Sequence, residues 1–192
     1  RSGSYNVLSS SLEAFENDFV KPSHYSVIDM AFGMQKDDGH SLVHYKTFSS
    51  TLQKQVMAFI RGGGRMFVSG AYIGSDMQRG DERDFLSEVF KTSYGGSDCN
   101  QTNNTVNGLG ISFDLIRHPN AVHYAATNVN VMRPANASSF CAMQYADGTD
   151  AAVAYDGADY KCFVMGFPFE CINSIKARQQ VMKAVMNFLT KK

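Results

Sequence analysis

The chain has 192 residues, 44% of them hydrophobic and 12% aromatic, the composition of a folded globular domain rather than of a disordered segment. Its 18 Lys and Arg residues equal its 18 Asp and Glu residues, so no net charge attracts nucleic acid or an anionic membrane surface. No apolar stretch approaches the length that crosses a bilayer, so no membrane insertion is expected. The length predicts one domain over residues 1–192, and a start at Arg1 rather than Met indicates a fragment of a longer chain.

The first elements predicted are a strand, a helix and a second strand. Residues 5–8 are strand-like, and apolar residues at helical spacing over 12–19 follow the serines at 9–11, which suit a helix start. Residues 25–32 form a continuous apolar run that stops at Gly33. Such runs are typical of strands covered on both faces, as in parallel sheets.

Residues 47–77 form the clearest unit of the sequence. Apolar residues repeat at i, i+4, i+7 and i+8, which predicts one stripe of an amphipathic helix, and Ser49 or Ser50 suits its start. Glycines 62–64 end this helix, and a strand follows over 65–68. A helix between two apolar strands predicts a right-handed parallel crossover. The apolar stripe consists of Leu52, Val56, Phe59 and Ile60.

The second half predicts helices at both of its ends and antiparallel strands between them. A helix is expected over 81–91, an exposed polar loop over 94–110, and a final helix over about 174–189. Asp156–Asp159 reads as the turn of a hairpin. The fold class expected from the whole sequence is a three-layer α/β domain with a mainly parallel sheet, to which antiparallel strands are added. Those strands are predicted at 111–116, 140–145, 151–155 and 160–167.

Ligands of open parallel sheets bind beyond the carboxyl ends of the strands, which directs attention to three turns. The candidate catalytic residues there are Ser69, Asp76 and Glu170. Each also has a structural interpretation: a small residue in a tight turn, a helix-capping carboxylate and a solvated turn residue. The candidate binding residues at the same turns are Gly33, Tyr72 and Ser75.

Metal and cofactor sites are not predicted. His40 and His44 are four residues apart, but no glutamate of an H-E-x-x-H motif accompanies them. Glycines 62–64 precede a strand instead of a helix and so cannot form a phosphate-binding loop. The four cysteines lack C-x-x-C spacing; Cys141 and Cys162 suit small buried side chains, and Cys99 lies in a polar stretch. The remaining cysteine is Cys171.

Four motifs together resemble a known family. They are V-I-D-M-A-F-G-M-Q-K at 27–36, G-G-R-M-F-V-S-G-A-Y-I-G-S-D at 63–76, D-G-T-D-A-A-V-A-Y at 147–155 and F-V-M-G-F-P-F-E at 163–170. The set resembles the C-terminal region of secreted Bacteroidetes proteins called xanthan lyases, and their order resembles the flavodoxin-type, Rossmann-like fold of glutamine amidotransferases. This resemblance implies an extracytoplasmic location and a polysaccharide, or other domains of the parent chain, as partners.

The resemblance also implies where catalytic residues should stand. Amidotransferases of this fold carry a cysteine on the turn that matches Ser69–Tyr72, and a histidine before Pro168 and Glu170. Here both residues are missing, so glutamine hydrolysis by that mechanism is not expected. Glu170 is the only remnant of that set.

Three hypotheses follow. The first is a non-catalytic or cryptic amidotransferase-like domain of a polysaccharide-processing protein, used for binding, scaffolding or interdomain packing. The second is a carbohydrate-active lyase or hydrolase, in which the side chains of Ser69, Asp76 and Glu170 converge on one cleft. The third is a glycan-binding module with a groove of exposed aromatic residues. Its candidate aromatic residues are Tyr72, Tyr94 and Tyr124.

Overall fold

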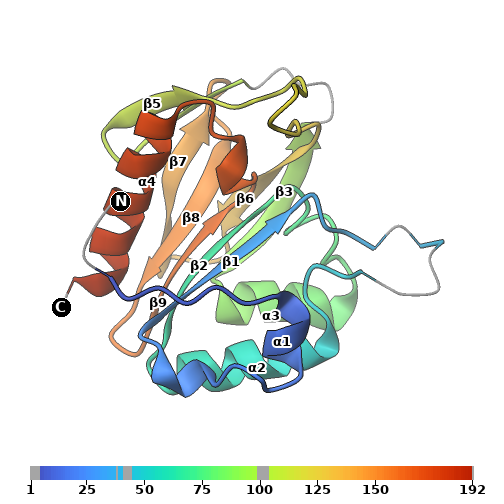
Figure 1. Ribbon diagram of the computed structural model, residues 1–192, viewed down its shortest axis with the longest axis vertical. Helices are drawn as coiled ribbons and strands as arrows, with labels where there is room; N and C mark the ends of the chain where they lie inside the picture. The colour runs from blue at the N-terminus through green and yellow to red at the C-terminus, as the bar shows by residue number, and fades with distance from the viewer. Residues whose placement is uncertain (1–4, 38, 41–44, 99–103, 192) are drawn as a thin grey trace.

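A computed structural model describes residues 5–37, 39–40, 45–98 and 104–191 of the chain. Its main feature is a seven-stranded sheet with the strand order β1-β2-β9-β8-β7-β4-β5 (Figure 1). The strands are β1 (Val27–Gly33), β2 (Arg65–Gly70), β9 (Lys161–Met165), β8 (Asp150–Asp156), β7 (Ser139–Tyr145), β4 (Thr105–Gly108) and β5 (Ile111–Asp114).

The crossover predicted for residues 47–77 is confirmed. Helix α2 (Ser50–Arg61) joins β1 to β2, and these two strands pair in parallel. Ser49 caps the helix start, because its Oγ accepts a hydrogen bond from the Leu52 amide at 3.1 Å. The chain leaves the helix through Gly63, whose φ of +80° is a conformation that glycine adopts without steric cost. Strand β2 therefore enters the sheet directly after the glycine run.

The expectation of a mainly parallel, flavodoxin-like sheet is wrong. Only the pairs β1–β2 and β2–β9 are parallel, whereas β9–β8, β8–β7, β7–β4 and β4–β5 are antiparallel. The apolar runs of β8 and β9 are buried on both faces although these strands form an antiparallel hairpin. Burial on both faces indicates layers above and below a strand, and it does not report the direction of the neighbouring strand.

The polar segment predicted as a loop over 94–110 also differs. Thr92–Asp98 is strand β3, which pairs with β6 (Val129–Pro134) in a separate two-stranded sheet, and β4 occupies part of the remainder. Residues 5–8, predicted as a strand, have no regular structure. Helix α1 (Leu12–Glu16) is shorter than the predicted 12–19, and the Phe19 side chain is 82% exposed.

Helices cover both faces of the large sheet. Helix α4 (Ile175–Thr190) packs on one face with Phe67, Phe163 and Leu189 in the core between them. Helices α2 and α3 (Gly80–Val89) lie on the opposite face, and α1 packs against α2 (Figure 1). Two 3-10 turns complete the chain, η1 (Pro22–His24) and η2 (Phe169–Cys171). Among the described residues, no helix is both long and apolar enough to cross a membrane.

Candidate functional site

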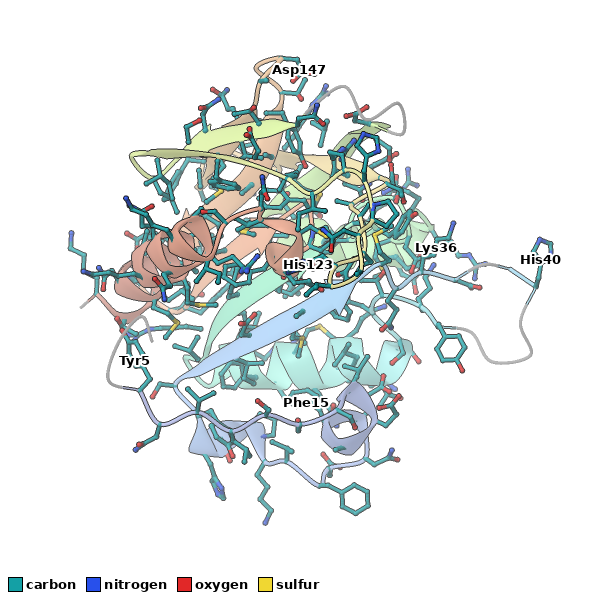
Figure 2. The ribbon with its side chains drawn as sticks, turned by 45° about the horizontal axis from the view of Figure 1, so that its top comes forward. Tyr5, Phe15, Lys36, His40, His123 and Asp147 are labelled. Carbon is teal, nitrogen blue, oxygen red and sulfur yellow. The ribbon has the colours of Figure 1, made fainter. Side chains whose placement is uncertain are left out.

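A cavity of about 610 Å³ opens at the carboxyl end of β1. Its walls come from three separate parts of the chain: the end of β1, the connection between β5 and β6, and η2. Figure 2 shows this connection, which carries His123, beside the end of β1. The lining residues are Ala31, Phe32, Gly33, Met34, Pro119, Tyr124, Ala125, Thr127 and Glu170.

Glu170 supplies the carboxylate of this cavity. Pro168 precedes η2, so the chain turns directly after β9 and places Glu170 at the cavity wall. Its Oε1 accepts a hydrogen bond from the Tyr124 hydroxyl, 46 residues away in the sequence. Its Oε2 is buried and has no hydrogen-bond partner. A buried carboxylate oxygen without a donor is costly, so this atom is the clearest place for a ligand donor to bind.

Gly33 allows the close approach of these side chains. Its φ of +55° is a left-handed conformation that glycine adopts readily. A Cβ at this position would lie 2.9 Å from the Tyr124 hydroxyl oxygen and 3.2 Å from Glu170 Oε1. Any side chain at this position would displace the hydrogen-bonded pair of Tyr124 and Glu170. Gly33 therefore contributes to the site because it leaves space for this pair.

Asp29 is the second carboxylate near the cavity. Side chains alternate along β1, so Asp29 lies on the same face as the cavity residue Ala31, the face on which Val27 packs towards α4. Asp29 is an exposed residue of an edge strand, but its carboxyl group is partly removed from water. This desolvation, together with the nearby charge of Glu170, raises the pKa of Asp29 to about 6.

Two titratable groups near Glu170, the Tyr124 phenol and the Cys171 thiol, are held in their neutral forms. Burial and the hydrogen bond to Glu170 raise the pKa of the Tyr124 phenol above its usual range, although the residue is 41% exposed. Burial, then the charge of Glu170, raises the pKa of the Cys171 thiol to about 12. Cys171 is therefore not a thiolate nucleophile at neutral pH.

Ser69 lies on the cavity face of the sheet but is completely buried. It stands between Ala31 of β1 and Met165 of β9 in the strand register. Its hydroxyl has no hydrogen-bond partner, and unlike Glu170, Ser69 does not line the cavity. A nucleophile needs a base within hydrogen-bond reach, and Ser69 has none.

We expect Ser69→Ala to leave ligand binding unchanged and to raise the stability slightly. The substitution removes a buried hydroxyl without a partner, whose desolvation costs about 1 kcal/mol or more. Urea unfolding would measure the change, with Ser87→Ala as a control on the surface of α3. A loss of activity or binding in Ser69→Ala would contradict the structural role.

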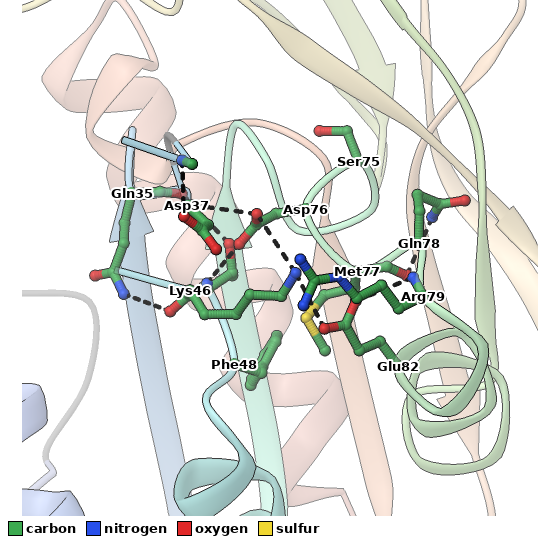
Figure 3. A network of polar contacts seen from close by, with 12 residues as sticks. Gln35, Asp37, Lys46, Phe48, Ser75, Asp76, Met77, Gln78, Arg79 and Glu82 are labelled. Carbon is green, nitrogen blue, oxygen red and sulfur yellow. Dashed lines mark hydrogen bonds and ion pairs between the residues drawn. The ribbon is translucent and has the colours of Figure 1, made fainter. Parts of the chain in front are cut away.

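Asp76 organises a loop instead of a catalytic site (Figure 3). Its Oδ2 accepts a hydrogen bond from the Thr47 amide at 2.7 Å, and its Oδ1 accepts one from the Asp37 amide at 3.2 Å. Lys46 lies 3.8 Å from Asp76 and 3.0 Å from Glu82, with its side chain largely buried. The carboxylate therefore fixes both ends of the segment that connects β1 to α2.

The predicted convergence of three catalytic side chains does not occur: no hydrogen bond or ion pair joins Ser69, Asp76 and Glu170, all of which the structure describes. Of the predicted binding residues, only Gly33 lines the cavity with Glu170. Tyr72 packs under Lys36, whose Nζ lies 4.9 Å from the ring centre, and Ser75 donates its backbone amide to Asn130. No catalytic role was predicted for Asp29, although a carboxylate inside the apolar run at 25–32 is a usable signal.

A second cavity of about 550 Å³ lies at the opposite, amino ends of β1 and β2. Gln55 in its lining donates its side-chain amide to Asp18 at 3.1 Å, while its Oε1 is buried without a partner. Ligands of sheets with parallel strands bind at the carboxyl ends, so the Glu170 cavity is the better candidate.

No site for metal or thiol chemistry is present in the described part of the chain. No group of three or more His, Cys, Asp and Glu side chains there is placed to hold a metal ion. Cys162 is buried, as predicted, while Cys141 is half-buried, and both are free thiols. His44 and Cys99 lie outside the described residues.

No protein-family model matches the chain, and no curated protein matches it. Solved structures do share its fold. The exo-β-1,4-mannosidase Op5Man5 from Opitutaceae bacterium strain TAV5 aligns over 90% of this chain with a TM-score of 0.58 and 9% identity. The GH42 β-galactosidase Gan42B from G. stearothermophilus aligns over 86% with a TM-score of 0.56 and 13% identity. The N-terminal domain of mmIFT52 aligns over 90% with a TM-score of 0.52 and 11% identity.

These likenesses establish a shared fold and correct the family expectation. This chain spans 27% of the mannosidase and 22% of the β-galactosidase, but 82% of the mmIFT52 domain. The resemblance to glutamine amidotransferases and to xanthan lyases is wrong, because the similar solved structures include a mannosidase and a β-galactosidase, and the sheet is mostly antiparallel. Short strand motifs carried that resemblance, and apolar strand segments recur in unrelated sheets.

Proposed function

We propose that this chain serves a carbohydrate-active protein and binds sugar in the Glu170 cavity. The observation that carries the proposal is the carboxylate of Glu170, with one oxygen held by Tyr124 and the other buried and without a donor. Carboxylate oxygens accept hydrogen bonds from sugar hydroxyls, and charge-assisted bonds of this kind are the stronger ones. The fold shared with a mannosidase and a β-galactosidase supports the same class of ligand.

The shape of the cavity agrees with such a ligand. Ala31, Phe32 and Gly33 give it an apolar wall, and the half-exposed ring of Tyr124 offers a face to the carbon–hydrogen side of a sugar ring. An apolar cavity with a few converging polar groups is the usual form of a small-molecule site. The pairing of Glu170 with Tyr124 fixes the acceptor before a ligand arrives, which lowers the cost of ordering on binding.

Glu170→Gln should weaken binding of a sugar by about ten- to a hundredfold, because a hydrogen bond to a charged group contributes about 1.5–3 kcal/mol. Titration of a panel of monosaccharides and oligosaccharides, followed by NMR chemical shifts, measures this change and locates it. Glu88→Gln, an exposed glutamate on α3, is the matched control. Equal binding by both variants would contradict the proposed site.

A second candidate function is hydrolysis of a glycosidic bond by Asp29 and Glu170. Glycosidases use two carboxyl groups, one of which has a raised pKa and donates a proton. The raised pKa of Asp29, at about 6, beside the charge of Glu170 matches that pattern. Asp29→Asn should then abolish release of nitrophenol from aryl glycosides and leave binding intact. Turnover that persists in Asp29→Asn would exclude Asp29 as the acid, and no turnover by the unchanged protein would leave binding as the only function.

A further inference from the structure

The cavity carries negative charge without a fixed positive partner. Glu170 is the only ionisable acid or base among the described residues that line it, apart from the neutral phenol of Tyr124. Neither a lysine nor an arginine lines it. Three buried carboxylates elsewhere have close cations: Lys46 lies beside Asp76 and Glu82, and Arg117 lies beside Asp98. Glu170 thus differs from these three carboxylates.

A second carboxylate increases this charge. Asp29 lies on the cavity face of β1, and the charge of Glu170 acts on it. With a pKa of about 6, Asp29 is mostly ionised at neutral pH, so its negative charge adds to that of Glu170. His118 and His123 stand next to the lining residues Pro119 and Tyr124 in the sequence, and neither histidine lines the cavity. Their two rings do not supply a positive group inside it.

We propose that the cavity selects an amino sugar, whose protonated amine binds Glu170 Oε2 while the ring packs on the apolar wall and Tyr124. This inference rests on the proposed sugar-binding function and adds the class of sugar. A neutral hydroxyl would satisfy the hydrogen bond of Oε2, but only a cation would also offset the two carboxylates. Close pairing of opposite charges in a partly desolvated site favours the cationic ligand over its neutral isostere.

Matched monosaccharides test this selectivity. Glucosamine, N-acetylglucosamine and glucose share one ring and differ at C2, where they carry an ammonium, a neutral amide and a hydroxyl group. Each is titrated into the protein at pH 7 and followed by NMR chemical shifts of residues 31–34 and 124–127. We expect glucosamine to bind at least about tenfold more tightly than the other two, the size of one charge-assisted hydrogen bond. 2-Aminoethanol, which has the amine without the ring, should bind no better than glucose.

The variants separate the failure of the inference from that of the proposed function. Glu170→Gln should remove the preference for glucosamine, whereas Glu88→Gln should keep it. If glucose and glucosamine bind equally and Glu170→Gln weakens the binding of both, the amino-sugar inference is overturned and the sugar site is kept. Binding of 2-aminoethanol as tight as that of glucosamine would also overturn it, because the sugar ring would then contribute nothing. Shifts with none of the three sugars would overturn the sugar site and the inference together.

Discussion

Phe48→Ala is expected to lower the free energy of unfolding by about 3–5 kcal/mol, the usual cost of removing a buried phenylalanine. Phe48 is completely buried, and its ring centre lies 4.7 Å from Phe32 and 5.3 Å from both Phe85 and Phe90. The ring therefore joins β1 to the α3 region. Its removal would leave a cavity that the surrounding rings cannot fill without moving.

Binding at the Glu170 cavity should change little, because the Phe32 ring packs with Phe48 on the opposite face of β1 from Ala31. Urea unfolding and a sugar titration would measure the two effects on the same variant. Phe19→Ala is the matched control, since that side chain is 82% exposed and should change the stability by less than about 0.5 kcal/mol. Equal stability of the two variants would show that the ring cluster contributes little.

Asp76→Ala is expected to destabilise the protein by about 2–4 kcal/mol. The change leaves the amides of Thr47 and Asp37 without their carboxylate acceptor, and each buried donor left unsatisfied costs about 1–3 kcal/mol. It also removes one of the two carboxylates beside Lys46. The segment between β1 and α2 should lose its structure before the rest of the domain, because these contacts hold that segment in place.

Hydrogen exchange of the Thr47 amide, together with urea unfolding, would detect that local loss. Asp84→Ala is the control, since Asp84 is an exposed aspartate on α3. Faster exchange at Thr47 in Asp76→Ala alone is the expected result. Should the two variants exchange alike, the contacts drawn in Figure 3 would not stabilise the segment.

Helices and strands could be predicted where the apolar pattern and the residues at both ends of the segment indicate the same element. Helix α2 has a serine cap, a regular apolar stripe and a glycine stop, and it forms at the predicted place. Strand β3 could not be predicted, because T-S-Y-G-G-S-D contains two glycines and an aspartate and only Thr92 and Tyr94 favour a strand. It forms through contacts distant in sequence: β6 pairs with it, and Asn130 of β6 donates its side-chain amide to Ser97 at 3.0 Å.

The candidate site could be predicted only in part for the same reason. Glu170 and Gly33 were found because each follows a strand end, where ligands bind in such sheets. Tyr124 could be named as an aromatic residue, but no sequence pattern links it to a glutamate 46 positions later. Ser69 was a wrong candidate, because it is completely buried. Small residues near the end of a strand have the same sequence pattern whether they are exposed or buried.

The three-part construction of the cavity has a thermodynamic consequence. Its walls come from β1, from the connection before β6 and from η2, so the pocket exists only when the whole sheet is assembled. A ligand of this pocket binds the native chain and not the unfolded one, and so raises the melting temperature through linkage. At a hundred times its dissociation constant the ligand adds about 2.7 kcal/mol, which corresponds to roughly 5–10 °C for a chain of this size. Thermal melting is therefore a direct way to rank candidate sugars before any reaction is known.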